Sequence, residues 1–174
     1  MRRIRITLFV VSVLLSICLC TTESHIVAAD VLNPDMVPEA GSWDKPAATI
    51  GKTPKDVWTG TTIEAAVKGV PLKGEVVTMV GEIVDMSCYL QLGKHGAKHK
   101  DCAQKCASHG EPIGLLTKAG DVYILLPEEH HPRRDVGTKL RETLIKYMAS
   151  IVEVTGTKTL VEGIKTIYVQ GYVE

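Results

Sequence analysis

A cluster of cysteine and histidine residues is the feature of this chain best suited to chemistry. Three of the five cysteines and three of the six histidines lie between positions 88 and 109. Thiolate sulfur and imidazole nitrogen are protein ligands that suit zinc and copper. The cluster therefore predicts a metal or redox site, and its members are Cys88, His95, His99, Cys102, Cys106 and His109.

Part of the cluster follows the period of an α-helix. Four of the side chains are spaced i, i+4, i+7 and i+11, positions that share one helical face. We expect this helix to run from Ala97 or Lys98 to Ser108, with Gly110 as its left-handed stop. Cys88 would end the preceding strand and fold back onto the same face. The four side chains are His95, which falls at or just before the first turn, His99, Cys102 and Cys106.

The preferred hypothesis is a closed tetrahedral metal site. Zinc favours a shell of three cysteines and one histidine, and copper(I) is the main competitor because thiolates select it. Binding would also fold the insert, since a short helix flanked by glycines is marginal alone. A closed shell leaves no open coordination position, which argues against metal-dependent hydrolysis, and we assign no catalytic residue. The expected ligands are Cys88, His99, Cys102 and Cys106, with His95 and His109 as alternatives.

Two alternatives without metal remain open. A disulfide from Cys88 to Cys102 or Cys106 would pin the insert to the barrel, whereas a Cys102–Cys106 bridge is near the limit of disulfide geometry. Alternatively, the lysines of the insert would lower a thiol pKa and favour thiol–disulfide exchange. A metal site requires His99, while a disulfide-stabilised module is indifferent to its replacement.

The N-terminus has the features of a secretory signal. Three arginines precede an apolar run from Ile6 to Cys20, which is short for a membrane-spanning helix. We expect cleavage after Ala29, a mature chain without a membrane span, and a periplasmic or secreted location. Cleavage would remove two cysteines and leave three, and an odd number cannot form a purely intramolecular disulfide framework.

Charge and composition exclude nucleic acid as a partner. The chain has 20 basic and 20 acidic residues, and residues 1–29 contain three arginines and one glutamate, so the predicted mature chain carries a net charge of −2. Its only phenylalanine lies in the signal, which leaves few aromatic side chains for base stacking. A partner, if there is one, is expected to be another protein of the cell envelope.

The remaining sequence predicts an arm followed by a small β-barrel. Residues 30–70 are rich in Pro, Gly, Thr and Ala and form the expected arm, and residues 71–174 form one domain. Within it we expect five β-branched strands, a helix between the third and fourth strands, and the Cys/His insert, 88–110, between the first and second. This order is that of a five-stranded OB-like Greek-key barrel, mainly β with α. The predicted strands are 75–86, 112–117, 122–126, 151–157 and 164–173, and the predicted helix is 136–148.

Three motifs add a resemblance to this interpretation. Together they resemble a family of small exported bacterial proteins of OB-like architecture, over about residues 74–173. The resemblance implies an envelope location and a functional role for the insert, and it supplies no reaction. The motifs are Gly81-x3-Asp85-x2-Cys88-Tyr89-Leu90, then Gly93-x2-Gly96-x2-His99-x2-Cys102-Ala103-x2-Cys106, then Gly110-x-Pro112-x-Gly114-Leu115-Leu116-Thr117.

The sequence thus predicts an exported protein that binds zinc or copper, for metal handling or as a structural or interaction module. The alternative is a disulfide-stabilised or thiol-redox interaction module of the envelope that holds no metal.

Overall fold

The computed structural model describes residues 36–54, 57, 66–127 and 139–171. The predicted signal, 1–29, and the first residues of the predicted helix 136–148 lie outside this part of the chain. Within the described part, no helix is long and apolar enough to cross a membrane.

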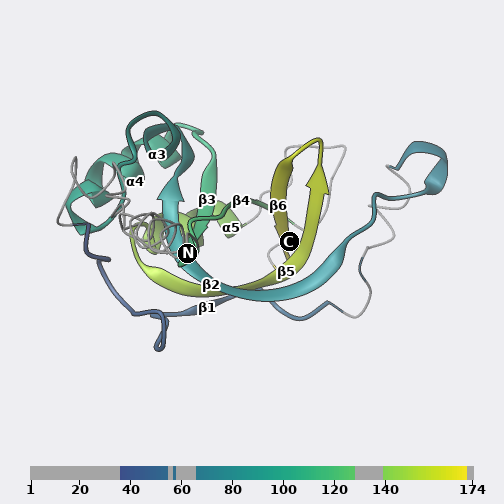
Figure 1. The fold of residues 1–174 in the computed structure, drawn as a ribbon, viewed down its shortest axis with the longest axis horizontal. Coiled ribbons are helices and arrows are strands. Elements are labelled where there is room, and N and C mark those ends of the chain that lie inside the picture. Colours follow the sequence, from purple (N-terminus) through teal and green to yellow (C-terminus); the bar gives the residue numbers. More distant parts are fainter. Residues whose placement is uncertain (1–35, 55–56, 58–65, 128–138, 172–174) are drawn as a thin grey trace, which may run out of the picture. The chain divides into compact units, whose positions relative to one another are not determined.

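Five strands close into a barrel (Figure 1). Their order is β5-β2-β3-β4-β6, and β6 pairs back onto β5. All neighbouring strands are antiparallel except β4 and β6, which are parallel. This connectivity is that of the OB-fold, so the predicted fold class is confirmed. The strands are β2 (Glu75–Asp85), β3 (Ile113–Thr117), β4 (Val122–Pro127), β5 (Ile151–Val161) and β6 (Ile164–Val169).

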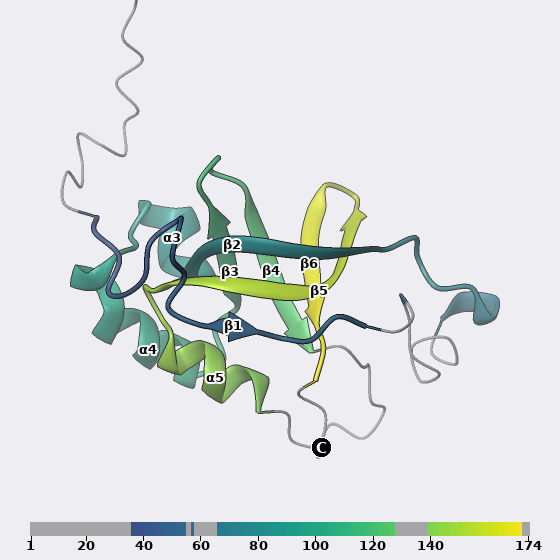
Figure 2. The same ribbon diagram turned by 90° about the horizontal axis from the view of Figure 1, so that it is seen from below.

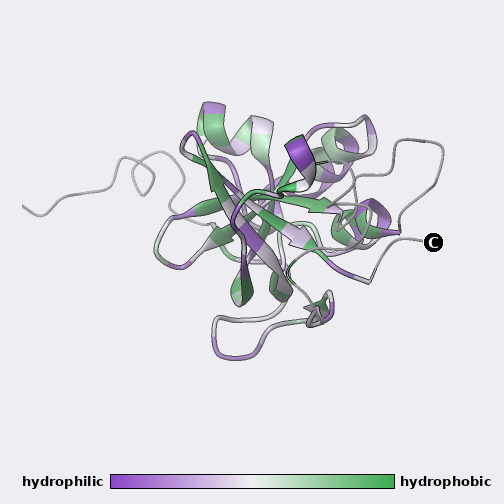
Figure 3. Ribbon diagram, turned by 90° about the vertical axis from the view of Figure 1, so that its right-hand side faces the viewer, coloured by the Kyte–Doolittle hydropathy of each residue, from purple (hydrophilic) through white to green (hydrophobic). Residues whose placement is uncertain are grey.

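The interior of the barrel is aliphatic, as a chain with few aromatic residues requires. Ile83, Leu115, Val154 and Ile167 are all fully buried and come from four different strands. Figure 3 shows hydrophobic residues along these strands. Gly156 lets three strands meet, because it pairs with both β2 and β6, and a Cβ atom there would lie 2.2 Å from the Tyr168 carbonyl oxygen.

Residues 36–54 of the predicted arm lie along the barrel and add an edge strand to it (Figure 2). A two-residue strand, β1 (Thr49–Ile50), pairs in parallel with β5, and Ile50 is only 1 % exposed. Before it, the Ala47 N–H donates to the Ile151 carbonyl over 2.8 Å. The sequence did not predict β1, because poor hydrophobic periodicity conceals a strand of two residues. A 3-10 turn, η1 (Val67–Gly69), precedes β2.

The Cys/His insert lies between β2 and β3, as predicted, but it contains an additional helix. The elements are α3 (Met86–Leu92), the 3-10 turn η2 (Ala97–His99) and α4 (Lys100–Ser108). The first predicted strand was one residue too long, since β2 ends at Asp85. The Asp85 carboxylate caps α3 by accepting the Ser87 N–H over 3.0 Å, and Gly93 ends α3 with a φ of 67°.

The helix between β4 and β5, α5 (Leu140–Lys146), packs against α4 of the insert. Figure 2 shows α4 beside α5. Gln104 Nε2 donates to the Ile145 carbonyl over 2.9 Å, and Arg141 Nη1 donates to the Ala107 carbonyl over 2.8 Å. These bonds, together with the burial of Ala103 and Ala107, fix α4 relative to the barrel.

Candidate metal centre

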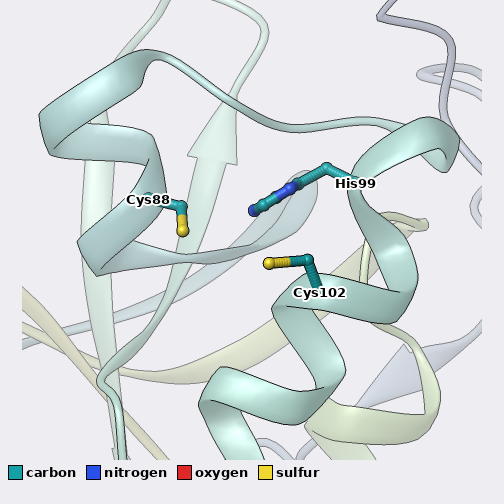
Figure 4. A group of neighbouring side chains, drawn as sticks. All are labelled: Cys88, His99 and Cys102. Atoms are coloured by element: carbon teal, nitrogen blue, oxygen red, sulfur yellow. The ribbon is translucent and has the colours of Figure 1, made fainter.

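Three side chains of the insert converge on one point (Figure 4). Cys88 comes from α3, His99 from η2 and Cys102 from the first turn of α4. One ligand atom from each side chain lies within 4.8 Å of the ligand atoms of the other two. This spacing allows a single ion to contact all three, because zinc bonds to sulfur and nitrogen are about 2.0–2.3 Å long.

A second group of ligand atoms shares one member with the first. Asp85, Cys88 and Cys106 also lie within 4.8 Å of one another. Asp85 is the last residue of β2, and Cys106 lies one helical turn beyond Cys102 on α4. Cys88 is therefore the residue that the two groups of ligand atoms share.

The structure thus brings the four main predicted ligands to one region but divides them between two groups. Cys88, His99 and Cys102 form one group, and Cys106 joins Cys88 in the other. The sequence had predicted one closed shell of four. Asp85, which was not among the expected ligands, is the additional member.

His95 belongs to neither group of the described residues and is held elsewhere. Its Nδ1 lies 2.9 Å from Glu82 Oε2, and Glu82 Oε1 accepts the Gly96 N–H over 2.6 Å. The His95 ring also meets the Tyr89 ring edge-on, with 5.9 Å between centroids. Gly96, with a φ of 77°, interrupts the predicted helical face between His95 and His99. His95 consequently anchors the loop before η2 to the barrel.

His109 also lies outside the groups that the described residues form. It follows the last residue of α4 and is exposed, and its Nδ1 lies 2.7 Å from the Lys105 carbonyl oxygen. The spacing of the sequence could not separate it from the other histidines, because it follows Cys106 at a helical interval.

Each group contains a buried polar atom that lacks a hydrogen-bond partner. Among the described residues, these atoms are His99 Nε2 in the first group and Asp85 Oδ2 in the second. His99 is 9 % exposed and Asp85 is 1 % exposed. A buried polar atom without a partner costs about 1–3 kcal/mol. A cation at each atom would supply the missing interaction.

The imidazole of His99 is suited to metal binding. Burial lowers its pKa, and Lys94 and His95 lower it further, while Asp85 opposes them. The neutral form is therefore favoured at neutral pH, and neutral imidazole is the form that ligates metals.

Two of the thiols, Cys88 and Cys106, have raised pKa values, contrary to the effect expected from the neighbouring lysines. Burial, and then the Asp85 carboxylate, raise the pKa of Cys88 to about 12. The same two causes raise the pKa of Cys106. The three cysteines of the described residues, Cys88, Cys102 and Cys106, are all free thiols. Without a metal, Cys88 and Cys106 are protonated at neutral pH, and a bound metal would displace their protons.

Glu82 is the residue of this region that the sequence analysis missed. It is 2 % exposed, and both of its oxygens contact the loop that leads to His99. The sequence contained an indication of its role, because Glu82 is a charged residue within the otherwise apolar run from Met79 to Val84.

Comparison with protein-family models, with curated proteins and with solved structures found no match. Inferences about the chemistry of the site therefore rest on its own residues.

Proposed function

We propose that this is an exported metal-binding protein whose insert holds zinc or copper(I) at Cys88, His99 and Cys102. One observation carries the proposal: His99 Nε2 is buried, has no hydrogen-bond partner, and belongs to the group whose other ligand atoms are two thiols. Two sulfur ligands and one imidazole favour a soft or borderline ion over magnesium or calcium, which require oxygen ligands.

Metal handling is a better match to this arrangement than a purely structural metal. Cys102 is exposed and Cys88 is partly exposed, whereas His99 is buried. An ion held by the three side chains would be accessible from solvent on its sulfur side. Three protein ligands also leave a coordination position at which a donor or acceptor of metal could attach.

The location of the protein in the cell envelope is part of the proposal. It is supported by the basic and apolar pattern of residues 1–29 and by the resemblance of residues 74–173 to exported proteins. A metal would also protect the thiols from oxidation in such a compartment.

A disulfide clip is the second candidate. It is favoured by one observation: the Cys88 ligand atom lies within 4.8 Å of those of both Cys102 and Cys106. A disulfide would, however, leave His99 Nε2 and Asp85 Oδ2 without partners, and the raised pKa values of Cys88 and Cys106 disfavour thiolate attack. Metal binding accounts for more of the site.

Metal content and free thiols, measured on one sample purified without chelators, test the proposal. We expect bound zinc or copper, and less of it in His99→Ala and Cys102→Ser than in the unmodified protein. His109→Ala is the matched control, because His109 is an exposed histidine of the same insert outside both groups. A metal-free protein with a single titratable thiol would refute metal binding and establish the disulfide clip.

A further inference from the structure

We infer that the insert holds two divalent cations that share the thiolate of Cys88. The outer position is formed by Cys88, His99 and Cys102, and the inner position by Asp85, Cys88 and Cys106. This inference rests on the proposed function, because it divides the proposed site into two coordination positions.

The separation of the ligand atoms supports two positions. Ligands of one zinc ion at bonds of about 2.0–2.3 Å lie no more than about 4.6 Å apart. The atoms within each group satisfy this limit approximately, since none is more than 4.8 Å from another member. The described ligand atoms form two such groups rather than one group of five. A single ion in this arrangement therefore contacts one group, with Cys88 as the only thiol common to both.

The buried atoms without partners give a second, independent argument. His99, whose buried Nε2 has no partner, belongs only to the outer group, and Asp85, whose buried Oδ2 has none, belongs only to the inner group. A single ion in the outer position would satisfy the His99 imidazole. It would leave the Asp85 carboxylate with only a protonated thiol, such as that of Cys106, as a hydrogen-bond donor. Two ions satisfy both atoms, and both residues are at least nine-tenths buried.

The charges of the ligands also balance with two divalent ions. Three thiolates and one carboxylate carry four negative charges, and the imidazole is neutral when it binds metal. Two divalent cations carry four positive charges, so the complete centre is neutral.

The single-ion alternative is specific enough to be tested. In it, the outer position is filled and the Cys106 thiol stays protonated and donates to Asp85. The two alternatives differ in the number of ions bound and in the effect of replacing Asp85.

The test is the number of Cd²⁺ ions bound by the reduced, metal-free full chain, measured by native mass spectrometry and by ¹¹³Cd NMR. We expect two ions and two ¹¹³Cd resonances for the unmodified protein. Asp85→Asn keeps a side-chain oxygen that can cap α3 but removes the charge, and His99→Ala removes the outer imidazole. Each variant should retain one ion and lose one resonance, and Cys88→Ser should perturb both positions.

His109→Ala is the control for adventitious binding and should keep two ions. One ion in the unmodified protein, or two ions in Asp85→Asn, would overturn the shared-thiolate centre while leaving the proposed metal-binding function intact. No bound Cd²⁺ at all would refute both. Far-UV circular dichroism of each variant establishes that the fold is retained.

Discussion

Glu82 Oε2 and His95 Nδ1 lie 2.9 Å apart, and this pair ties the Cys/His insert to the barrel. Glu82 belongs to β2, whereas His95 lies in the loop, residues 93–96, that leads to His99 through η2. The other Glu82 oxygen accepts the Gly96 N–H, so one buried carboxylate holds two consecutive residues of that loop. Because His99 follows directly through η2, the pair positions the imidazole of the candidate site.

Replacement of Glu82 should weaken both the fold and the site. Glu82→Ala leaves the Gly96 N–H without its partner, so we expect the free energy of unfolding to fall by about 2 kcal/mol. Glu82→Gln should be milder, because its amide oxygen can still accept that N–H. Urea denaturation and zinc titration of both variants provide the measurement. Equal stability of the alanine variant and the unmodified protein would show that the pair does not hold the loop.

Metal should stabilise the folded protein through His99. At a free zinc concentration of about 100 times Kd, we expect the free energy of unfolding to rise by about 2.7 kcal/mol. His99→Ala should lose the part of this gain that comes from the ion bound at His99, while His109→Ala should keep all of it. Thermal unfolding with and without zinc makes the comparison. Calcium and magnesium should produce no shift, because Asp85 is the only carboxylate in either group. A shift with either ion would contradict a sulfur and nitrogen site.

The three thiols should differ in reactivity once metal is removed. Burial and Asp85 raise the pKa of Cys88 to about 12, so little of it is thiolate at pH 7, whereas Cys102 is exposed. We expect iodoacetamide to modify Cys102 faster than Cys88 by more than about tenfold, as followed by peptide mass spectrometry. Asp85→Asn removes the negative charge, which should lower the pKa of Cys88 and speed its alkylation. Unchanged alkylation of Cys88 in that variant would exclude the carboxylate as a cause.

The arm should contribute to stability through Ile50. This side chain is 1 % exposed and belongs to the aliphatic core, so Ile50→Ala should lower the free energy of unfolding by about 3 kcal/mol. Ile50→Val is the matched control, with an expected loss of about 1 kcal/mol. The Glu39–Lys100 ion pair, 2.7 Å long and partly exposed, should contribute less than about 1 kcal/mol. If Ile50→Ala unfolded like the unmodified protein, the arm would be dispensable.

The barrel could be predicted from the sequence because its strands have local signals. β-branched runs and the turn between Thr117 and Asp121 indicate the strands, and the order of elements indicates the closure. β1 could not be predicted in this way, since two residues are too few for a period and its position depends on hydrogen bonds to β5. Tertiary contact, rather than local preference, makes Thr49–Ile50 a strand.

The sequence predicted which residues belong to the candidate site better than it predicted how they are arranged. Residue type and spacing indicated Cys88, His99, Cys102 and Cys106. The spacing also assumed one continuous helical face, which Gly96 interrupts with a φ of 77°. His95 consequently turns to Glu82, and the backbone conformation that causes this is not visible in the spacing. Asp85 carried a recognisable signal, because aspartate before Met86 is a common N-cap.

The position of the ligands in the chain has a consequence for the order of folding. All of them lie between Asp85 and Cys106, so short loops are enough to bring them together. The barrel, in contrast, must join β2 to β5 across much longer separations, such as the 77 residues between Thr78 and Thr155. The entropic cost of closing a loop rises with its length, so pairings between distant parts of the chain form slowly. If the insert binds metal as proposed, capture of the ion therefore does not have to await closure of the barrel, and the metal-bound insert would be an early nucleus from which the rest of the chain folds.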